Sequence, residues 1–351
     1  MRWLIAAVAL IAAGVLIWQC WPFAGDKGGT VTDANVGRAA GKGDAKSSGK
    51  DGKDAKLAKA GKAGGDAKAP TDTAPANGAI LKLQEMTPAA ALETLRKGEQ
   101  HLADKRLAEG RAELSKALLS GKLPAEKEES ARKTLSDLAD KMLLSGQVFD
   151  GDPYTLQYAF QSGDLLAKVE RKLELHVPPQ LLLRINGMDD ARRIRTGQTL
   201  KVIRGPFHAI VTKGKFTLDV YLYREGCEPA FIRRLRVGLG KDGATPVGLW
   251  RVKLGSKQER ANWFTPPNSP VQKAIAWGEP DYPLGKRGLW IGLEGIEDNT
   301  RNHQGYGIHG TNDPASIGRS ESLGCIRLAD ADIELIFSLL YEHWSTVRVR
   351  A

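Results

Sequence analysis

The sequence predicts a multidomain protein whose residues 205–351 form a mostly-β domain with one packed helix. A small strand–helix–helix–strand module at 153–204 and a short α-helical segment at 79–147 precede this domain. Two observations support the prediction. After residue 207, apolar and polar residues alternate in short runs that Gly and Pro separate, which is typical of β-strands. Through 79–147, leucines recur every three to four residues with charges between them, which is typical of helices.

An apolar run at the N-terminus predicts a signal anchor over residues 1–25. Residues 3–25 carry no charge and the stretch from Trp3 to Ile17 is almost wholly apolar, which is long enough to cross a bilayer, since that takes about 20 residues. Arg2 on its N-terminal side favours an orientation with the N-terminus inside. A cleaved signal peptide and a lipoprotein modified at Cys20 are the alternatives, in that order.

Residues 26–78 are dominated by Gly, Ala, Lys and Asp and show no apolar periodicity. Ordering such a stretch would not be offset by burial of apolar surface, so it is predicted to be a disordered linker. The formal net charge of the whole chain is +10. Because this charge is spread along the chain rather than gathered in a basic stripe with aromatic residues, no nucleic-acid partner is expected.

The helical segment at 79–147 contains a stretch, 108–114, that resembles part of a tetratricopeptide helix pair. A further helix is expected from Pro124 to about Leu144, with Gly146 after its end. Only one such unit is present, whereas a stable array needs three or more. We therefore expect a small helical hairpin or bundle that serves packing or spacing.

Turn signals punctuate the module at 153–204. Ser162-Gly163-Asp164 precedes a predicted helix, Asn186-Gly187 follows a second one, and Thr196-Gly197-Gln198 precedes the final strand. This order resembles a LysM domain, a βααβ fold that binds glycans containing N-acetylglucosamine. The resemblance implies that the edges of a glycan groove lie at Gly163, Asp164, Asn186 and Gly187. A small α+β adaptor without a ligand is the alternative.

A cysteine–histidine pair near the C-terminus predicts the chemistry. His309 and Cys325 stand sixteen residues apart, each beside glycine. The thiolate is the nucleophilic form of cysteine, so a neighbouring imidazole has to take its proton. The backbone N–H groups of Gly324 and Cys325 are candidate donors to an oxyanion. The alternatives are a buried structural cysteine with a core histidine, or a disulfide with Cys227 that would consume the nucleophile.

The surrounding residues resemble the L,D-transpeptidase, or YkuD-type, catalytic domain. The resemblance rests on His309-Gly310-Thr311-Asn312, on the run 322–328 around Cys325, and on the turn Thr245-Pro246-Val247-Gly248. It covers about residues 207–351. One position departs from the family pattern, because Leu323 stands where a histidine is usual, two residues before the cysteine. We interpret this as the loss of a histidine that would assist catalysis, rather than as the loss of enzymatic activity.

The resemblance implies acyl transfer on the stem peptides of peptidoglycan. Cys325 would attack a tetrapeptide stem and expel the terminal D-alanine, and an amine of a neighbouring stem would then form a 3→3 crosslink. His309 would be the general base and acid, oriented by the backbone carbonyl of Gly310. No cofactor is implied, and the spacing of Asp298 and His303 fits no common metal site. The candidates for substrate binding are Arg327, Tyr306 and Ser322.

Alternative functions use the same residues. An L,D-carboxypeptidase would resolve the thioester with water, a binding protein would use the LysM-like module beside a silent catalytic domain, and a general cysteine protease would cleave ordinary L-peptides. The expected partners are peptidoglycan stems and glycan strands, with the membrane at the N-terminus. The expected location is the extracytoplasmic, periplasmic side of a bacterial envelope, anchored by one transmembrane helix or secreted after cleavage.

Overall fold

A computed structural model describes residues 75–265 and 273–351 of the chain. All of these residues belong to one compact unit. The predicted signal anchor and nearly all of the predicted linker therefore lie outside the described residues.

The predicted membrane-anchored location has to be corrected. Within 75–265 and 273–351, no helix is both long enough and apolar enough to cross a membrane. The apolar run on which that location rested, residues 1–25, falls outside these ranges. The anchored location is therefore not carried further.

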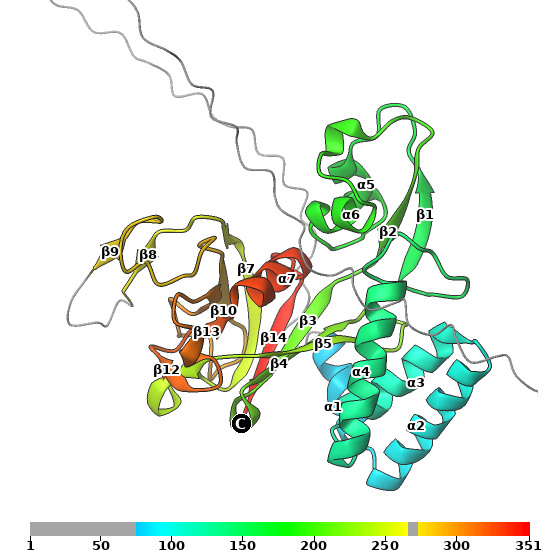
Figure 1. The fold of residues 1–351 in the computed structure, drawn as a ribbon, viewed down its shortest axis with the longest axis horizontal. Helices are drawn as coiled ribbons and strands as arrows, with labels where there is room; N and C mark the ends of the chain where they lie inside the picture. The colour runs from blue at the N-terminus through cyan, green and yellow to red at the C-terminus, as the bar shows by residue number, and fades with distance from the viewer. Residues whose placement is uncertain (1–74, 266–272) are drawn as a thin grey trace, which may run out of the picture. The chain divides into compact units, whose positions relative to one another are not determined.

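Four helices precede the module (Figure 1). The first begins within the range predicted as linker, and its Ala76 and Ile80 are buried. Thr87 caps the second helix by accepting a hydrogen bond from the Ala90 N–H at 3.2 Å. The helices are α1 (Pro75–Gln84), α2 (Pro88–Ala103), α3 (Leu107–Leu119) and α4 (Ala125–Met142).

The module at 153–204 has the predicted order of strand, helix, helix and strand. Its strands β1 (Thr155–Ala159) and β2 (Thr199–Ile203) pair antiparallel. Between them lie α5 (Leu166–Lys172), α6 (Pro179–Ile185) and a 3-10 turn, η1 (Ala191–Arg193). Apolar residues of both helices and β2 are buried together, namely Val169, Leu181, Leu182, Ile185 and Val202.

An eight-stranded sheet forms the centre of the C-terminal domain, in the order β13-β11-β10-β7-β14-β3-β4-β5. The last strand of the chain, β14, lies between β7 and β3, so the sheet closes only when the C-terminus inserts. Its strands are β3 (Phe207–Thr212), β4 (Thr217–Leu222), β5 (Ala230–Arg236), β7 (Gly248–Gln258), β10 (Trp290–Gly295), β11 (Gly307–Gly310), β13 (Ile326–Leu328) and β14 (Thr346–Arg350).

Short elements complete this domain. The predicted packed helix is α7 (Asp330–Leu339), which directly follows the cysteine motif. Two further pairs lie outside the main sheet: β6 (Leu239–Gly240) with β12 (Ser320–Ser322), and β8 (Trp263–Phe264) with β9 (Ala274–Ile275). The 3-10 turns are η2 (Lys213–Lys215), η3 (Lys241–Gly243) and η4 (Pro314–Ser316).

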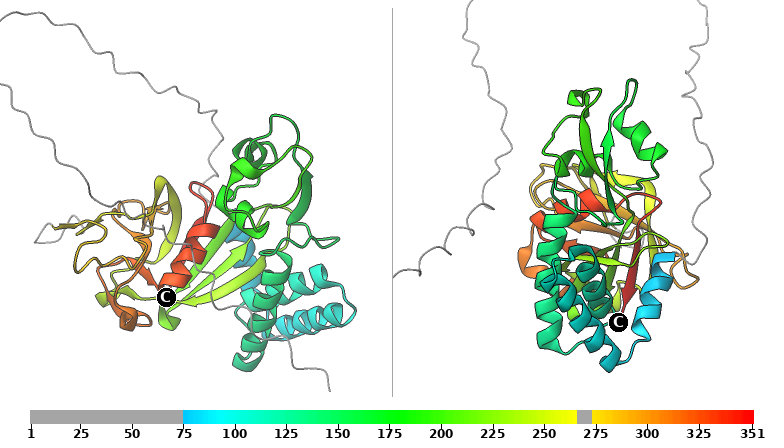
Figure 2. Two further views of the ribbon diagram at one scale, coloured as in Figure 1. Left: turned by 45° about the horizontal axis from the view of Figure 1, so that its top comes forward. Right: turned by 90° about the vertical axis from the view of Figure 1, so that its right-hand side faces the viewer.

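The helical segment covers the β5 end of the sheet (Figure 2), where α3 and α4 pack against that strand. An edge strand exposes unpaired backbone groups unless something covers it. Here the Ser115 hydroxyl accepts the Phe231 N–H at 3.0 Å, and Arg234 of β5 bonds to Glu128 of α4. The helices therefore act as a cover for the sheet edge, which agrees with the predicted packing role.

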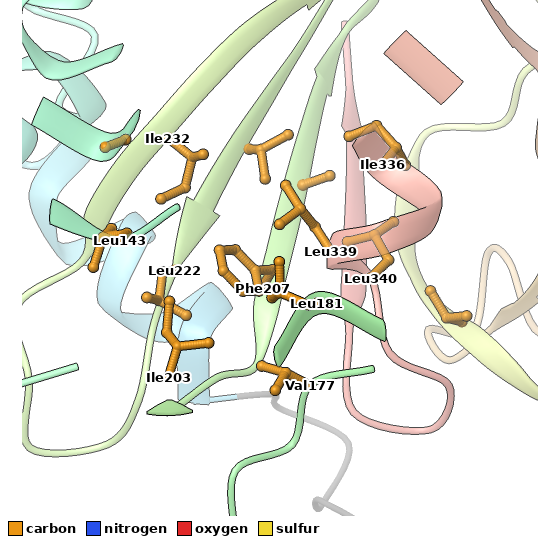
Figure 3. Close-up of a cluster of buried hydrophobic side chains, with 14 of the residues drawn as sticks. Leu143, Val177, Leu181, Ile203, Phe207, Leu222, Ile232, Ile336, Leu339 and Leu340 are labelled. Carbon is orange, nitrogen blue, oxygen red and sulfur yellow. The ribbon is translucent and has the colours of Figure 1, made fainter. Parts of the chain in front are cut away.

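One hydrophobic core joins the helical segment, the module and the sheet (Figure 3). In that view, leucines and isoleucines of α7 converge with side chains of β3, β4 and β5 and with residues of the module. Buried polar contacts join the same segments. Arg111 of α3 makes two hydrogen bonds to Asp152, at 2.8 and 3.0 Å. Lys201 of β2 donates to three carbonyls at the end of α4 and just after it, those of Met142, Ser145 and Gln147.

Candidate active site

Neighbouring parallel strands bring the predicted cysteine and histidine together. His309 on β11 pairs in register with Arg327 on β13, and with Trp290 on β10 from its other side. Side chains paired across a sheet share one face, and residues two apart on a strand share it too. Cys325, two residues before Arg327, therefore faces the same side as His309, Arg327 and Trp290.

The hydrogen bonding of His309 fixes which ring nitrogen acts as the base. Its Nδ1 lies 2.6 Å from the carbonyl oxygen of Gly310. A carbonyl only accepts, so Nδ1 carries the proton and Nε2 keeps a free lone pair. Gly310 is the residue whose carbonyl is expected to orient the imidazole, and that role stays a prediction. The Trp290 ring stacks on the imidazole, with centroids 5.6 Å apart and planes 15° apart.

Burial determines the charge state of His309, which is only 5% exposed. Burial lowers the pKa of His309 to about 4, and the Arg327 charge lowers it further against the Gly310 hydrogen bond. The imidazole is therefore neutral at pH 7 and can accept a proton.

Cys325 is half-buried at the start of β13 and is not in a disulfide. Its Sγ lies 3.6 Å from the Gly305 carbonyl oxygen, to which the thiol donates. Burial raises the pKa of Cys325 to about 11, while the Gly307 backbone and the Arg327 charge oppose the rise. Water at the half-exposed side of the residue moderates this rise. The resting pair is thus a neutral thiol beside a neutral imidazole.

Hydrogen bonds inside the turn before Cys325 assign Ser322 a positioning role. Its hydroxyl accepts the Gly324 N–H at 3.1 Å and donates to the Cys325 carbonyl at 2.6 Å. Ser322 is only 3% exposed, so its side chain holds the turn rather than facing a substrate as predicted. The Gly324 N–H is also occupied by this contact. Of the two predicted oxyanion donors, the Cys325 N–H remains.

Arg327 and Tyr306 form the sides of the site. No carboxylate in the described part of the chain lies within ion-pair distance of the Arg327 guanidinium, which is half-exposed. Tyr306 packs on Trp250 at 5.2 Å between ring centroids. Burial and the nearby Cys325 raise the pKa of Tyr306. Arg327 therefore carries an available charge, and Tyr306 forms an aromatic wall beside the sulfur.

A cavity of about 460 Å³ lies beyond the C-terminal end of β11. Residues of the segment 277–286 line one side of it, among them Trp277, Tyr282 and Lys286. Thr311, Asn312 and Pro314, which follow His309 in the chain, line another side together with Asp330. The lining of this cavity thus carries both acidic and basic groups.

The predicted glycan-binding residues lie in two separate turns of the module. Asp164 accepts hydrogen bonds from the Tyr158 hydroxyl at 2.7 Å and the Gln161 N–H at 2.9 Å. The Asn186 amide bonds to the Leu182 carbonyl and to both backbone groups of Lys201. Both side chains already hold the module together. Gly163 and Gly187 have positive φ values of 83° and 65° and form the turns.

Two residues of the site escaped the sequence analysis. Trp290 was predicted only as part of a strand, because its place over His309 depends on the register of β10 and β11. Thr245 was noted only as part of a turn that the resemblance singles out. Its hydroxyl reaches the Gly324 carbonyl at 2.9 Å. Leu323, which replaces the usual histidine, is 64% exposed at the tip of the turn.

The fold and site define a β-domain with a cysteine–histidine pair on adjacent strands. Comparison with known proteins shows which family of domains it is similar to. Residues 208–349 match the family model of the L,D-transpeptidase catalytic domain, YkuD. Over these residues the chain is therefore similar to L,D-transpeptidase catalytic domains, as the sequence motifs indicated.

Curated relatives carry the same family name. The chain is 33% identical over 130 residues to "Probable L,D-transpeptidase YbiS" of Escherichia coli, which is 34% of this chain and 38% of YbiS. It is 41% identical over 105 residues to "Putative L,D-transpeptidase YqjB" of Bacillus subtilis, which is 30% of this chain and 52% of YqjB. The matched region thus spans well under two thirds of the length of each of these relatives.

A solved L,D-transpeptidase from Mycobacterium smegmatis is also similar, with 15% sequence identity and a TM-score of 0.30. The similarity covers 44% of this chain and 64% of that one.

Proposed function

We propose that this protein is a peptidoglycan L,D-transpeptidase that forms 3→3 crosslinks through a thioester on Cys325. The observation that carries the proposal is the shared face of β11 and β13. On it stand a thiol, an imidazole whose tautomer leaves Nε2 unprotonated, and an unpaired guanidinium. Because thiol and imidazole are both neutral at rest, the proton has to move as the sulfur attacks.

In the acylation step, Sγ of Cys325 bonds to the carbonyl carbon of the third stem residue. The thiol proton passes to Nε2 of His309, and negative charge develops on the carbonyl oxygen, where the Cys325 N–H can donate. When the tetrahedral intermediate collapses, the C–N bond to D-alanine breaks. The leaving nitrogen takes the proton back from the imidazolium.

In the second step, an amine of a neighbouring stem attacks the thioester carbonyl. It loses a proton to Nε2 of His309, an amide bond forms, and the C–S bond breaks with the electron pair returning to sulfur. The proton on the imidazolium then restores the thiol. His309 thus acts as base and acid in both halves of the reaction, which is the usual double role of such a group.

Charge and shape indicate how a stem would be held. Arg327 is suited to a stem carboxylate, because a guanidinium binds a carboxylate through two parallel hydrogen bonds. Tyr306 would support the stem beside the sulfur. The cavity is lined by Lys286, Glu279 and Asp281, so it offers both positive and negative groups. Such a lining suits an acceptor stem, because the acceptor carries both an amine and a carboxylate.

Glycan binding by the module at 153–204 is also a proposal. The side chains of Asp164 and Asn186 are committed within the module, so contacts to a glycan would come from the backbone of the two turns. The isolated protein should bind insoluble peptidoglycan, and chitin oligomers should compete. Binding that follows salt concentration and ignores the oligomers would point to the basic surface instead.

Mass spectrometry of the purified chain with disaccharide-tetrapeptide tests the proposed reaction. Crosslinked dimers support a transpeptidase, released tripeptide supports an L,D-carboxypeptidase, and no product contradicts both. A carbapenem should add its mass to Cys325. The Cys227→Ser variant should still form this adduct, since Cys227 lies in the turn between β4 and β5, whereas Cys325→Ser should form none.

A further inference from the structure

The peptide unit between Gly324 and Cys325 carries the remaining oxyanion donor. In a trans peptide the C=O and the N–H point in opposite directions. Whatever holds the Gly324 carbonyl therefore aims the Cys325 N–H. The Thr245 hydroxyl lies 2.9 Å from that carbonyl oxygen.

Thr245 is held so that its hydrogen goes to this carbonyl. Its Oγ1 accepts the Gly240 N–H at 2.8 Å. Since a backbone N–H only donates, the hydroxyl hydrogen is left for the Gly324 oxygen. Thr245 is 2% exposed, so water does not compete freely. The backbone around it is fixed in turn by Lys213, whose Nζ donates to the carbonyls of Thr245 at 2.6 Å and Gly243 at 3.1 Å.

Three backbone segments meet closely at this point. A Cβ on Gly240 would lie 2.6 Å from the Thr245 nitrogen and 2.8 Å from the Gly324 Cα. Gly324 has φ +129°, and a Cβ there would lie 2.9 Å from the Ala244 carbonyl oxygen. Only glycine fits at both positions. The close approach leaves the Gly324–Cys325 peptide little freedom apart from the direction that the threonine hydroxyl selects.

We propose that Thr245 is a positioning residue that orients the Gly324–Cys325 peptide and so aims the Cys325 N–H at the developing oxyanion. Ser322 complements it by occupying the Gly324 N–H. This inference rests on the proposed acyl transfer and deepens it. The carbonyl oxygen of the substrate would meet a donor whose direction is set by a side chain some eighty residues earlier in the chain.

The test compares two reactions of the same sulfur on the full chain. Acylation by imipenem forms an Sγ–C bond, breaks the ring C–N bond and passes through an oxyanion. Alkylation by iodoacetamide displaces iodide and forms none. For Thr245→Val we expect imipenem acylation to fall roughly 10²-fold, the typical cost of a misplaced catalytic group. The alkylation rate should remain that of the wild type.

Matched variants separate orientation from folding. Thr245→Ser keeps the hydroxyl and should restore acylation. Thr217→Val is the control for the substitution itself, because the Thr217 hydroxyl is buried without a partner in β4; both rates should stay at wild-type values. Thermal unfolding is followed in parallel. If the valine variant does not fold, Thr245→Ala removes the same hydroxyl without adding a methyl group.

Three results would overturn the inference: equal falls in both rates for Thr245→Val, unchanged acylation, or no rescue by serine. Failure of the proposed function would look different. The wild-type chain would then be alkylated at Cys325 but would not be acylated by imipenem.

Discussion

Two buried histidines on the same sheet differ in function although their surroundings are similar. His208 on β3 is 3% exposed and His309 on β11 is 5% exposed. Burial lowers the pKa of both, to about 3 for His208 and about 4 for His309. Each also stacks on an aromatic ring, Tyr221 at 5.5 Å and Trp290 at 5.6 Å. Neither burial nor pKa therefore distinguishes a catalytic histidine in this protein.

The difference lies in the backbone group that faces Nδ1. For His208 it is the Thr346 N–H, which donates to Nδ1 at 3.1 Å. For His309 it is the Gly310 carbonyl, which accepts from Nδ1. The first contact places the ring proton on Nε2 and the second leaves Nε2 free. Only His309 therefore has a basic nitrogen available on the face that Cys325 shares.

The largest expected effect comes from removing each histidine in turn. His309→Gln should lower turnover by roughly 10²–10⁴-fold, because a positioned acid–base group contributes that much. His208→Gln should leave turnover unchanged and affect stability only. The test measures crosslinking of disaccharide-tetrapeptide at pH 7 and compares the turnover of the two folded variants. Equal turnover of the two variants would contradict the assigned roles.

Acid stability should reveal what the two histidines have in common. In the unfolded chain each histidine takes up a proton near pH 6.5, whereas in the folded chain His208 does so only near pH 3 and His309 only near pH 4. The unfolded state thus holds more protons between these values, so stability falls as the pH drops below 6.5. For His309 the loss is on the order of 3 kcal/mol, since one pKa unit corresponds to about 1.4 kcal/mol.

Urea unfolding at pH 7 and pH 4.5 measures this loss. Both His208→Gln and His309→Gln should reduce the acid-induced decrease in the free energy of unfolding. An acid-induced decrease that is the same in both variants and the wild type would show that other groups cause it.

A smaller effect should come from Arg327, whose charge lowers the pKa of both Cys325 and His309 after burial has acted on each. In Arg327→Gln both pKa values should rise, so iodoacetamide alkylation of Cys325 should reach its alkaline midpoint at higher pH. Arg327→Lys keeps the charge and should retain the wild-type midpoint. An unshifted midpoint in Arg327→Gln would show that the charge of Arg327 does not affect the pKa of Cys325.

The smallest effect is expected at Leu323. Its side chain is 64% exposed, and an exposed substitution typically changes stability by no more than about 0.5 kcal/mol. Leu323→Ala should therefore keep both stability and turnover. Leu323→His should add little, because Nε2 of His309 is the base in the proposed reaction. A large gain in turnover with Leu323→His would show that proton transfer had been assigned to the wrong position.

The local parts of the site could be predicted from the sequence. His309, Cys325 and their glycines stand close together in the chain, and the alternation after residue 207 marks β3, β4 and β5 directly. The role of Ser322 could not be predicted, because a serine in a turn has the same pattern whether it faces a substrate or its own backbone. The packing of α3 and α4 on β5 could not be predicted either. Periodicity shows that a helix has an apolar face but not what that face packs against.

The sequence by itself singled out the candidate reacting groups, the Cys325 thiol and the His309 imidazole, together with the glycines beside them. It also determined the module order at 153–204 through turn residues and periodicity. The tertiary structure alone decided that Trp290 covers His309 and that Thr245 holds the Gly324 carbonyl. These contacts depend on strand register and on the approach of segments that are distant in the chain. No local sequence pattern encodes them.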